Sequence, residues 1–262
     1  MAEQQIRFDD GAAYERTMGI WSRLAGDVFI DWLAPRSDLR WIDIGCGNGA
    51  FTELLVERCA PAEVQGIDPS EGQLAFARAR PAARLAKFSQ GDAMALPFAE
   101  NRFDAVMMAL VIFFVSDPAK AVAEMVRVAA PGGIVATYVW DFLGGGSPSE
   151  AIDAELRTMG VTSPRPPSFG ASRMDALRDL WTAAGLVAVE SREITVQRTF
   201  ADFDDFWTAN ILNPRIGPAV AAMTSGDAER LKARLQARLP PDAAGRITYA
   251  ATANAIRACM PS

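Results

Sequence analysis

Apolar positions along the chain recur in two patterns that alternate. Between residues 12 and 34 they come every three or four residues, which predicts a helix that ends before Pro35. From there on, short apolar runs alternate with helical stretches: we predict strands at 39–44, 64–67, 86–90, 103–110 and 134–140, and helices at 50–58, 71–79 and 117–128. Strands that are apolar throughout are typical of a parallel sheet covered on both faces. The first half of the chain therefore predicts a doubly wound α/β fold.

The pattern changes after Trp140. Residues 144–148 and 164–167 are rich in glycine and proline and predict loops. The predicted elements that follow are a helix at 173–184, an alternating strand at 187–196, helical stretches within 202–239 and a closing strand at 246–256.

Composition and charge limit the kinds of partner and the cellular compartment that the sequence predicts. The chain has 262 residues, a formal net charge of -6 and a pI of about 4.9, so its average surface repels nucleic acid. The basic stretch from Arg230 to Arg238 is interpreted as the solvated face of a helix. The longest apolar run, residues 105–115, is too short to span a bilayer, and the charged stretch from Met1 to Asp10 is unlike a signal peptide.

Cysteine and histidine usage limits the chemistry. Three cysteines without a CxxC pair predict neither a disulfide framework nor a metal site, and they suit a reducing cytoplasm. The chain has no histidine, which excludes the commonest general base and the commonest metal ligand. The sequence does not indicate an oligomeric state.

A glycine-rich loop follows the first predicted strand, with Asp43, Gly45, Gly47 and Gly49 at alternate positions. Glycines at a strand-to-helix turn let a ligand approach the backbone. The series also fits the loose dinucleotide pattern, with Ala50 in the third glycine position. A pyrophosphate would be repelled by Asp43, whereas the sulfonium and ammonium groups of S-adenosylmethionine suit a carboxylate. The loop therefore favours S-adenosylmethionine over a nicotinamide cofactor.

Acidic residues also follow the second and third predicted strands. A carboxylate at Asp68 can accept hydrogen bonds from ribose hydroxyls, and this holds for either cofactor. After the third strand, Asp92 can accept a hydrogen bond from an adenine amino group, and the Ala93 backbone can meet the ring edge. These two sites predict nucleoside binding.

Taken in order, the motifs resemble those of class I S-adenosylmethionine-dependent methyltransferases. The similarity is greatest to the small-molecule group of the ubiquinone and menaquinone biosynthesis enzymes (methyltransferase type 11 domain). The motifs are Asp43-Ile44-Gly45-Cys46-Gly47-Asn48-Gly49, Gly66-Ile67-Asp68-Pro69-Ser70, Gly91-Asp92-Ala93, Leu96-Pro97-Phe98, Phe103-Asp104 and Pro131-Gly132-Gly133. The resemblance covers about residues 40 to 140. It implies a Rossmann-like sheet of seven strands whose last strand is antiparallel, with 246–256 as the candidate.

The resemblance also implies a role for each matching residue. The methionine moiety would lie at Asp43, Gly45 and Gly47, with Cys46 in the same loop. The ribose would lie at Asp68, with Pro69 and Gln73 beside it, and the adenine at Asp92 and Ala93. Ala109 and Leu110 would line the pocket near the sulfonium, and Tyr14, Met18 and Trp21 would cover the cofactor. Residues 1–36 would thus be a helical cover, 37–141 the cofactor-binding core, and 142–262 the rest of the sheet with cap helices at about 142–171 and 201–240.

One departure concerns the methyl acceptor. Many relatives have a histidine just after the fourth strand, whereas this chain has apolar residues that include Phe113 and Phe114. We expect methyl transfer to a small apolar or aromatic molecule, driven mainly by proximity, with S-adenosylhomocysteine as the product. No catalytic residue is assigned, and Tyr138, Asp141 and Glu150 near the fifth strand are more often structural. A binding protein without catalysis, and a nicotinamide-dependent oxidoreductase, remain as alternatives.

Overall fold

The computed structural model describes residues 11–262 and contains one sheet of seven strands in the order β3-β2-β1-β4-β5-β7-β6. The stretch from Met1 to Asp10 lies outside the described residues. The strands are β1 (Arg40–Ile44), β2 (Glu63–Asp68), β3 (Ala86–Gln90), β4 (Phe103–Ala109), β5 (Ala129–Trp140), β6 (Val187–Phe200) and β7 (Ile247–Cys259). The pairs among β1 to β5 are parallel, and β7 runs antiparallel to both of its neighbours. The predicted fold, with its antiparallel last strand, is confirmed.

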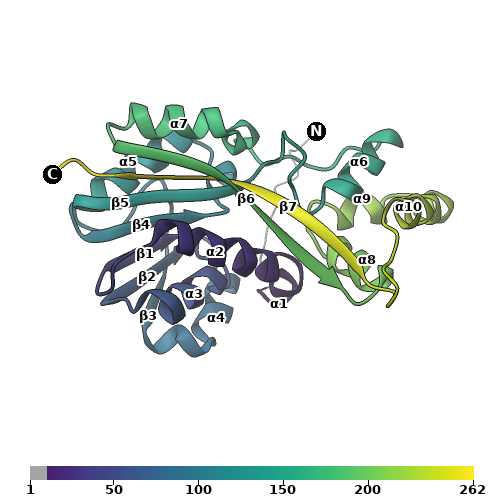
Figure 1. Ribbon diagram of the computed structural model, residues 1–262, viewed down its shortest axis with the longest axis horizontal. Coiled ribbons are helices and arrows are strands. Elements are labelled where there is room, and N and C mark those ends of the chain that lie inside the picture. Colours follow the sequence, from purple (N-terminus) through teal and green to yellow (C-terminus); the bar gives the residue numbers. More distant parts are fainter. Residues whose placement is uncertain (1–10) are drawn as a thin grey trace.

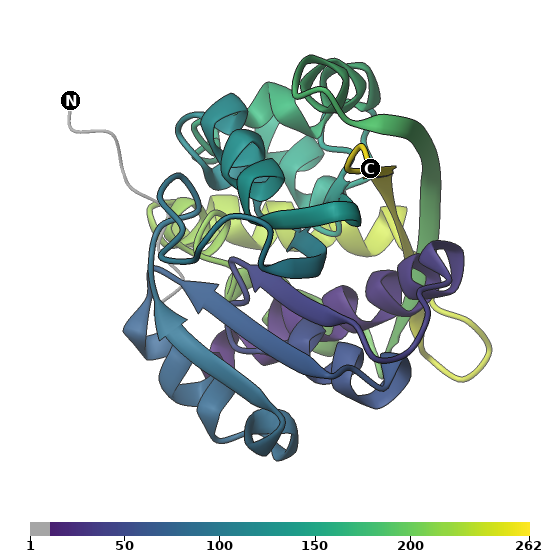
Figure 2. The same ribbon diagram turned by 90° about the vertical axis from the view of Figure 1, so that its left-hand side faces the viewer.

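Helices cover both faces of this sheet (Figure 1). One face carries α2 (Ile20–Leu33), α3 (Ala50–Cys59) and α4 (Glu71–Arg78), and the other carries α5 (Pro118–Val128) and α7 (Met174–Ala183). Figure 2 shows the two helix layers from the side, with the purple and blue helices on one side of the sheet and the green α7 on the other.

The strands are apolar throughout because consecutive side chains serve opposite faces. Trp41 and Met107 belong to the core formed with α2 and α3, whereas Ile42 and Met108 belong to the core formed with α5 and α7. Each strand of the middle of the sheet is therefore buried on both sides, as its composition predicts.

Two strands, β5 and β6, are each at least four residues longer than predicted. β5 begins at Ala129, and residues 130–133 bulge between the pairs Phe103–Ala129 and Ala105–Ile134. The Pro131-Gly132-Gly133 turn is therefore a bulge within a strand rather than its boundary. β6 continues to Phe200 because it pairs with β7 along its whole length.

The remaining helices form a cap at one end of the sheet (Figure 1). They are α6 (Glu150–Thr158), α8 (Phe203–Ile211), α9 (Gly217–Ala221) and α10 (Ser225–Arg238), and they lie where the antiparallel pair of β6 and β7 extends past the other strands. Short 3-10 turns occupy Pro81–Arg84, Ile112–Phe114 and Phe169–Ser172. Within residues 11–262, no helix combines the length and apolarity needed to cross a membrane.

The basic side chains of α10 are paired with acidic groups. Arg234 and Arg238 both contact Glu155 of α6, while Arg230 pairs with Asp227. These ion pairs fasten α10 to α6 and leave a mixed surface, in line with the interpretation of this stretch as a helix face.

Candidate functional site

The glycine-rich loop turns the chain sharply from the end of β1 into α3. The backbone N–H groups of Gly45 and Cys46 both donate to the carbonyl of Ile67, at 2.7 and 3.0 Å. Gly45, Gly47 and Gly49 have φ angles of +73°, +52° and +79°, in the left-handed region that favours glycine. The loop therefore depends on glycine for its shape.

The surroundings of these glycines differ. A Cβ at Gly45 would lie 2.4 Å from a methyl group of Val111, so the neighbouring side chain already fills that space. At Gly47 the nearest atom is Oε1 of Gln73, 3.9 Å away. Gly47 is therefore the point of the loop where a ligand can approach the backbone.

Asp43 is fully buried at the end of β1. Its Oδ2 accepts a hydrogen bond from the Thr52 hydroxyl at 2.6 Å, while its Oδ1 has no hydrogen-bond partner among residues 11–262. Burial raises the pKa of Asp43 to about 7. A buried carboxylate with an oxygen to spare fits a cationic ligand such as the ammonium or sulfonium of S-adenosylmethionine.

Asp68 holds the loop in place from the end of β2. Its two oxygens accept hydrogen bonds from the backbone N–H groups of Gly47 and Ser70, both at 2.9 Å. Each carboxylate oxygen has a second acceptor site, so Asp68 can still bind ribose hydroxyls. Burial raises its pKa. The pKa of Tyr14 is raised by burial and by the charges of Asp68 and Asp43, which puts the Tyr14 phenol in the field of both carboxylates.

The N-terminal segment is fastened to this loop by a polar cluster. The guanidinium of Arg80 donates to the Asn48 carbonyl at 2.6 Å and to Glu53 at 2.8 Å, and it also pairs with Glu15. The Asn48 amide donates to Glu15 at 2.7 Å. Glu15 opens a π-helical turn (Glu15–Gly19) between α1 (Gly11–Tyr14) and α2, a feature common at functional sites.

The other predicted cofactor residues lie around the same edge of the sheet. Gln73 is buried beside Gly47, Pro69 is exposed, and Asp92 is exposed with its carboxylate accepting from the Met94 N–H at 2.8 Å. Ala93 is half-buried, and Ala109 ends β4. The thiol of Cys46 is buried and faces Gly66, so only the backbone of Cys46 can face a ligand in the loop. The ring of Trp21 is buried edge-on against Trp140.

Beyond Leu110, at the carboxyl ends of β4 and β5, lies a cavity of about 40 Å³, called the aromatic cavity below. Leu110 has a φ of +61°, a strained conformation for a residue with a side chain. The residues that line the cavity are Tyr14, Met18, Leu110, Phe113, Phe114, Trp140, Phe142, Ser147, Pro148, Ser149, Asn213 and Arg215. This places Tyr14 between the two carboxylates and an apolar space, and Met18 lines the same space.

The acidic and phenolic candidates near β5 do not line this cavity. Tyr138 is fully buried in the core and donates a hydrogen bond to the carbonyl of Ser22 at 3.2 Å. Asp141 accepts from the Gly144 N–H at 2.9 Å, and Glu150 pairs with Arg157 on the surface. All three have structural contacts in the described chain, as expected.

The charged residue of the cavity wall, Arg215, is not among the residues predicted from the sequence. Arg215 and Asp153 are both nearly buried and face one another, yet they come from segments far apart in the chain. A lone arginine in a loop has no motif that would reveal such a pairing.

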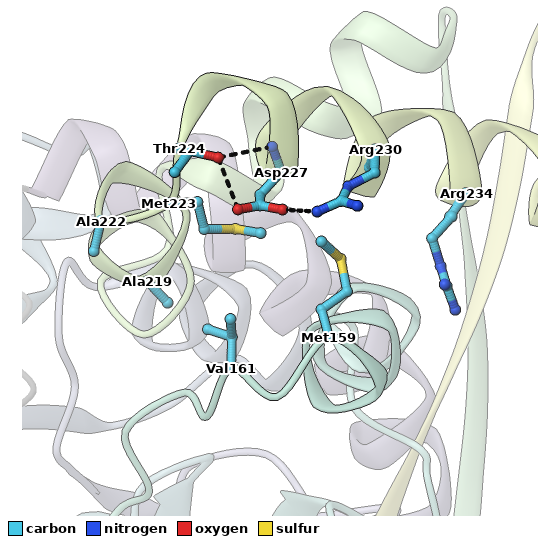
Figure 3. Close-up of a pocket in the computed structure, with 9 residues that line it drawn as sticks. All are labelled: Met159, Val161, Ala219, Ala222, Met223, Thr224, Asp227, Arg230 and Arg234. Atoms are coloured by element: carbon cyan, nitrogen blue, oxygen red, sulfur yellow. Dashed lines mark hydrogen bonds and ion pairs between the residues drawn. The ribbon is translucent and has the colours of Figure 1, made fainter.

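A larger hollow of about 500 Å³ lies between α6, α9 and α10 (Figure 3). Met159 and Met223 point toward one another across it, and Asp227 and Arg230 lie along its rim. Its lining shares no residue with the glycine-rich loop or the aromatic cavity. The chemistry of the loop therefore identifies the candidate site, although this hollow is larger.

Comparison with known proteins agrees with this geometry. Residues 42–137 match the methyltransferase domain family. The chain is 40% identical over 115 residues to a demethylmenaquinone methyltransferase of Thermus thermophilus (43% of this chain, 50% of the relative). It is 37% identical over 115 residues to a ubiquinone/menaquinone biosynthesis C-methyltransferase of Dinoroseobacter shibae (42% of this chain, 46% of the relative). The matched segment thus spans about half the length of these relatives.

The fold has relatives among solved structures as well. The YcgJ protein of Bacillus subtilis superposes with a TM-score of 0.58 at 17% identity, over 91% of this chain and 98% of that one. At this identity the likeness concerns the fold alone. Residues 42–137 therefore match a methyltransferase domain, and the sheet in which they lie agrees with the fold of its solved structural relatives.

Proposed function

We propose that this chain transfers the methyl group of S-adenosylmethionine to a small apolar or aromatic acceptor held in the aromatic cavity. The observation that carries the proposal is the position of Asp43. Its buried carboxylate, with one oxygen to spare, lies at the glycine-rich loop, and the aromatic cavity begins beyond Leu110 on the neighbouring strand.

In this proposal Asp43 and the backbone at Gly47 hold the methionine moiety, and Asp68 holds the ribose. Pro69 and Gln73 lie beside the ribose, and Asp92 and Ala93 receive the adenine. When bound, the cofactor supplies an electrophilic methyl group on a positively charged sulfur. The chain's own residues orient the two reactants and exclude water, which suffices for much of the acceleration of a displacement with a neutral leaving group.

The contacts of the N-terminal segment hold it as a cover over the proposed site. Arg80 and Asn48 hold the segment of Glu15, and that segment places Tyr14 and Met18 on the cavity. A cavity of about 40 Å³ holds a few water molecules and not a ring. Entry of an acceptor therefore requires that the surrounding segments move apart, as lids commonly do.

The apolar lining supports an apolar or aromatic acceptor, and so do the names of the relatives, which act on menaquinone and ubiquinone precursors. Calorimetry with S-adenosylhomocysteine tests the cofactor site, and transfer of a labelled methyl group to small phenols tests the reaction. Absence of binding to either form of the cofactor at millimolar concentration would refute the proposal. Binding without transfer to any acceptor would favour a non-catalytic binding protein.

A further inference from the structure

The aromatic cavity has one charged wall. Of the described residues that line it, only Tyr14 and Arg215 carry ionisable side chains. Arg215 follows α8 in the cap, its side chain is only 7% exposed, and its guanidinium lies over the Phe142 ring at 5.3 Å. Burying a cation costs free energy, and a site for a purely apolar ligand would not need one among its aromatic walls.

The described partners of Arg215 leave part of its charge available. Its Nε donates to the Pro164 carbonyl at 3.0 Å, which is a neutral acceptor. Its Nη2 is 3.5 Å from Oδ2 of Asp153, longer than the 2.7–2.9 Å of a strong charge-assisted bond. The same Asp153 oxygen also accepts from the Ser149 hydroxyl at 3.1 Å. The ion pair is therefore loose, and the guanidinium can donate to a further anion.

Hydroxyl groups lie beside this cation. Ser147 and Ser149 line the cavity, and their hydroxyl oxygens are 3.1 Å apart. A ligand oxygen at this wall would have the guanidinium within reach, and the Ser147 hydroxyl could donate to it by turning away from Ser149. Once the surrounding segments have moved apart, the ring that carries this oxygen would face Phe113, Phe114 and Phe142.

We propose that Arg215 binds an ionised oxygen of the methyl acceptor, which makes the acceptor class an aromatic ring carrying a phenolate-type oxygen. The inference rests on the proposed function only in taking the aromatic cavity as the acceptor site. It also accounts for the absence of histidine, because a site that favours the anion needs no base: the phenol loses its proton to solvent and binds in its nucleophilic form.

The test uses para-nitrophenol, whose anion absorbs visible light and whose neutral form does not. Its apparent pKa is measured with the full chain, with and without S-adenosylhomocysteine. Bound to the wild type, the phenol should show a lowered pKa, and Arg215→Met should remove this shift and weaken binding of the anion about tenfold. Arg215→Lys should keep part of the shift, because the charge remains.

Two further measurements distinguish a role of Arg215 in binding the anion from a purely structural role. Asp153→Asn removes the charge that opposes an anion, so it should strengthen binding of the phenolate, whereas a purely structural Arg215–Asp153 pair predicts no gain. This variant also decides the matter if Arg215→Met does not fold. The ether para-nitroanisole has the same shape and no acidic proton, and its affinity should be the same in the wild type and the Arg215 variants.

The inference is overturned if the wild type leaves the pKa of the phenol unchanged or raises it. It is also overturned if Arg215→Met binds the anion as well as the wild type does, or if Asp153→Asn binds it no more tightly. Calorimetry with S-adenosylhomocysteine reports on the proposed function separately, since failure of the cofactor to bind leaves the phenolate measurements intact.

Discussion

Replacing Asp43 with asparagine separates two effects of its carboxylate: the stability that its burial costs and the cofactor affinity that it contributes. The pKa of Asp43 rises from 3.8 to about 7 on folding because the group is buried. The folded chain therefore takes up a proton where the unfolded chain does not, and this group lowers the free energy of unfolding as pH rises from about 4 to about 7. This change in pKa lowers the free energy of unfolding by at most about 4 kcal/mol.

Asparagine keeps an acceptor for the Thr52 hydroxyl and carries no charge. At about pH 8, Asp43→Asn should therefore raise the free energy of unfolding, by up to about 4 kcal/mol, and the gain should vanish near pH 4. Urea unfolding at several pH values measures this. The matched control is Asp104→Asn: Arg40 lowers the pKa of Asp104 to about 2, so this change should cost about 1 kcal/mol above pH 4.

Asp43→Asn should also bind the cofactor more weakly than the wild type. The wild-type carboxylate binds a cation only when ionised, so affinity for S-adenosylhomocysteine should rise with pH through about 7. In Asp43→Asn the affinity should be lower by about 1.5–3 kcal/mol and nearly independent of pH. Calorimetry on both variants measures this, with Asp104→Asn expected to bind like the wild type. An Asp43→Asn chain with unchanged stability and unchanged affinity at about pH 8 would refute the reasoning.

Other substitutions test the loop and its cover. Asp68→Ala should weaken binding of S-adenosylhomocysteine by about 1–3 kcal/mol, and an unchanged dissociation constant in the folded variant would contradict the ribose role. Gly45→Ala places a Cβ 2.4 Å from Val111 and should lower the free energy of unfolding by about 1–3 kcal/mol. Gly47→Ala has no such clash and only the strain of its φ of +52°, so it should cost less stability and should reduce cofactor affinity about tenfold. Arg80→Leu should speed hydrogen exchange in residues 11–19, measured by mass spectrometry; equal exchange would show that the polar cluster does not hold this segment.

The core of the fold could be predicted because its signals are local. The strand at 86–90 and the helix that ends at Val128 have the predicted boundaries, since each lies between clear breaks in an apolar pattern. The end of β6 at Phe200 was missed because it depends on pairing with β7, and pairing between distant segments does not appear in local periodicity. The helix α6 lies within the cap segment predicted at about 142–171, but its bounds could not be predicted from a stretch that glycine and proline interrupt.

The residues of the candidate site also fall into those that local motifs predict and those that only the folded chain brings together. Asp43 and Asp68 could be found because they belong to motifs at strand ends. Their energetic state could not be predicted: the free oxygen of Asp43 and its raised pKa result from packing by α3 and the N-terminal cover. Arg215 and Asp153 could not be found at all, because only the folded cap brings them together.

The antiparallel pair of β6 and β7 has a consequence for how the cap is attached to the sheet. The segment that matches the methyltransferase domain ends within β5, whereas β6, β7 and the three cap helices between them are built from the residues that follow. The far end of the pair lies beyond the other strands, beside the cap helices (Figure 1), so we expect changes in the cap to leave the shape of the glycine-rich loop unaltered. Under the proposed function, chimeras that exchange residues 142–262 with a related chain should interchange the acceptors while they retain a common cofactor.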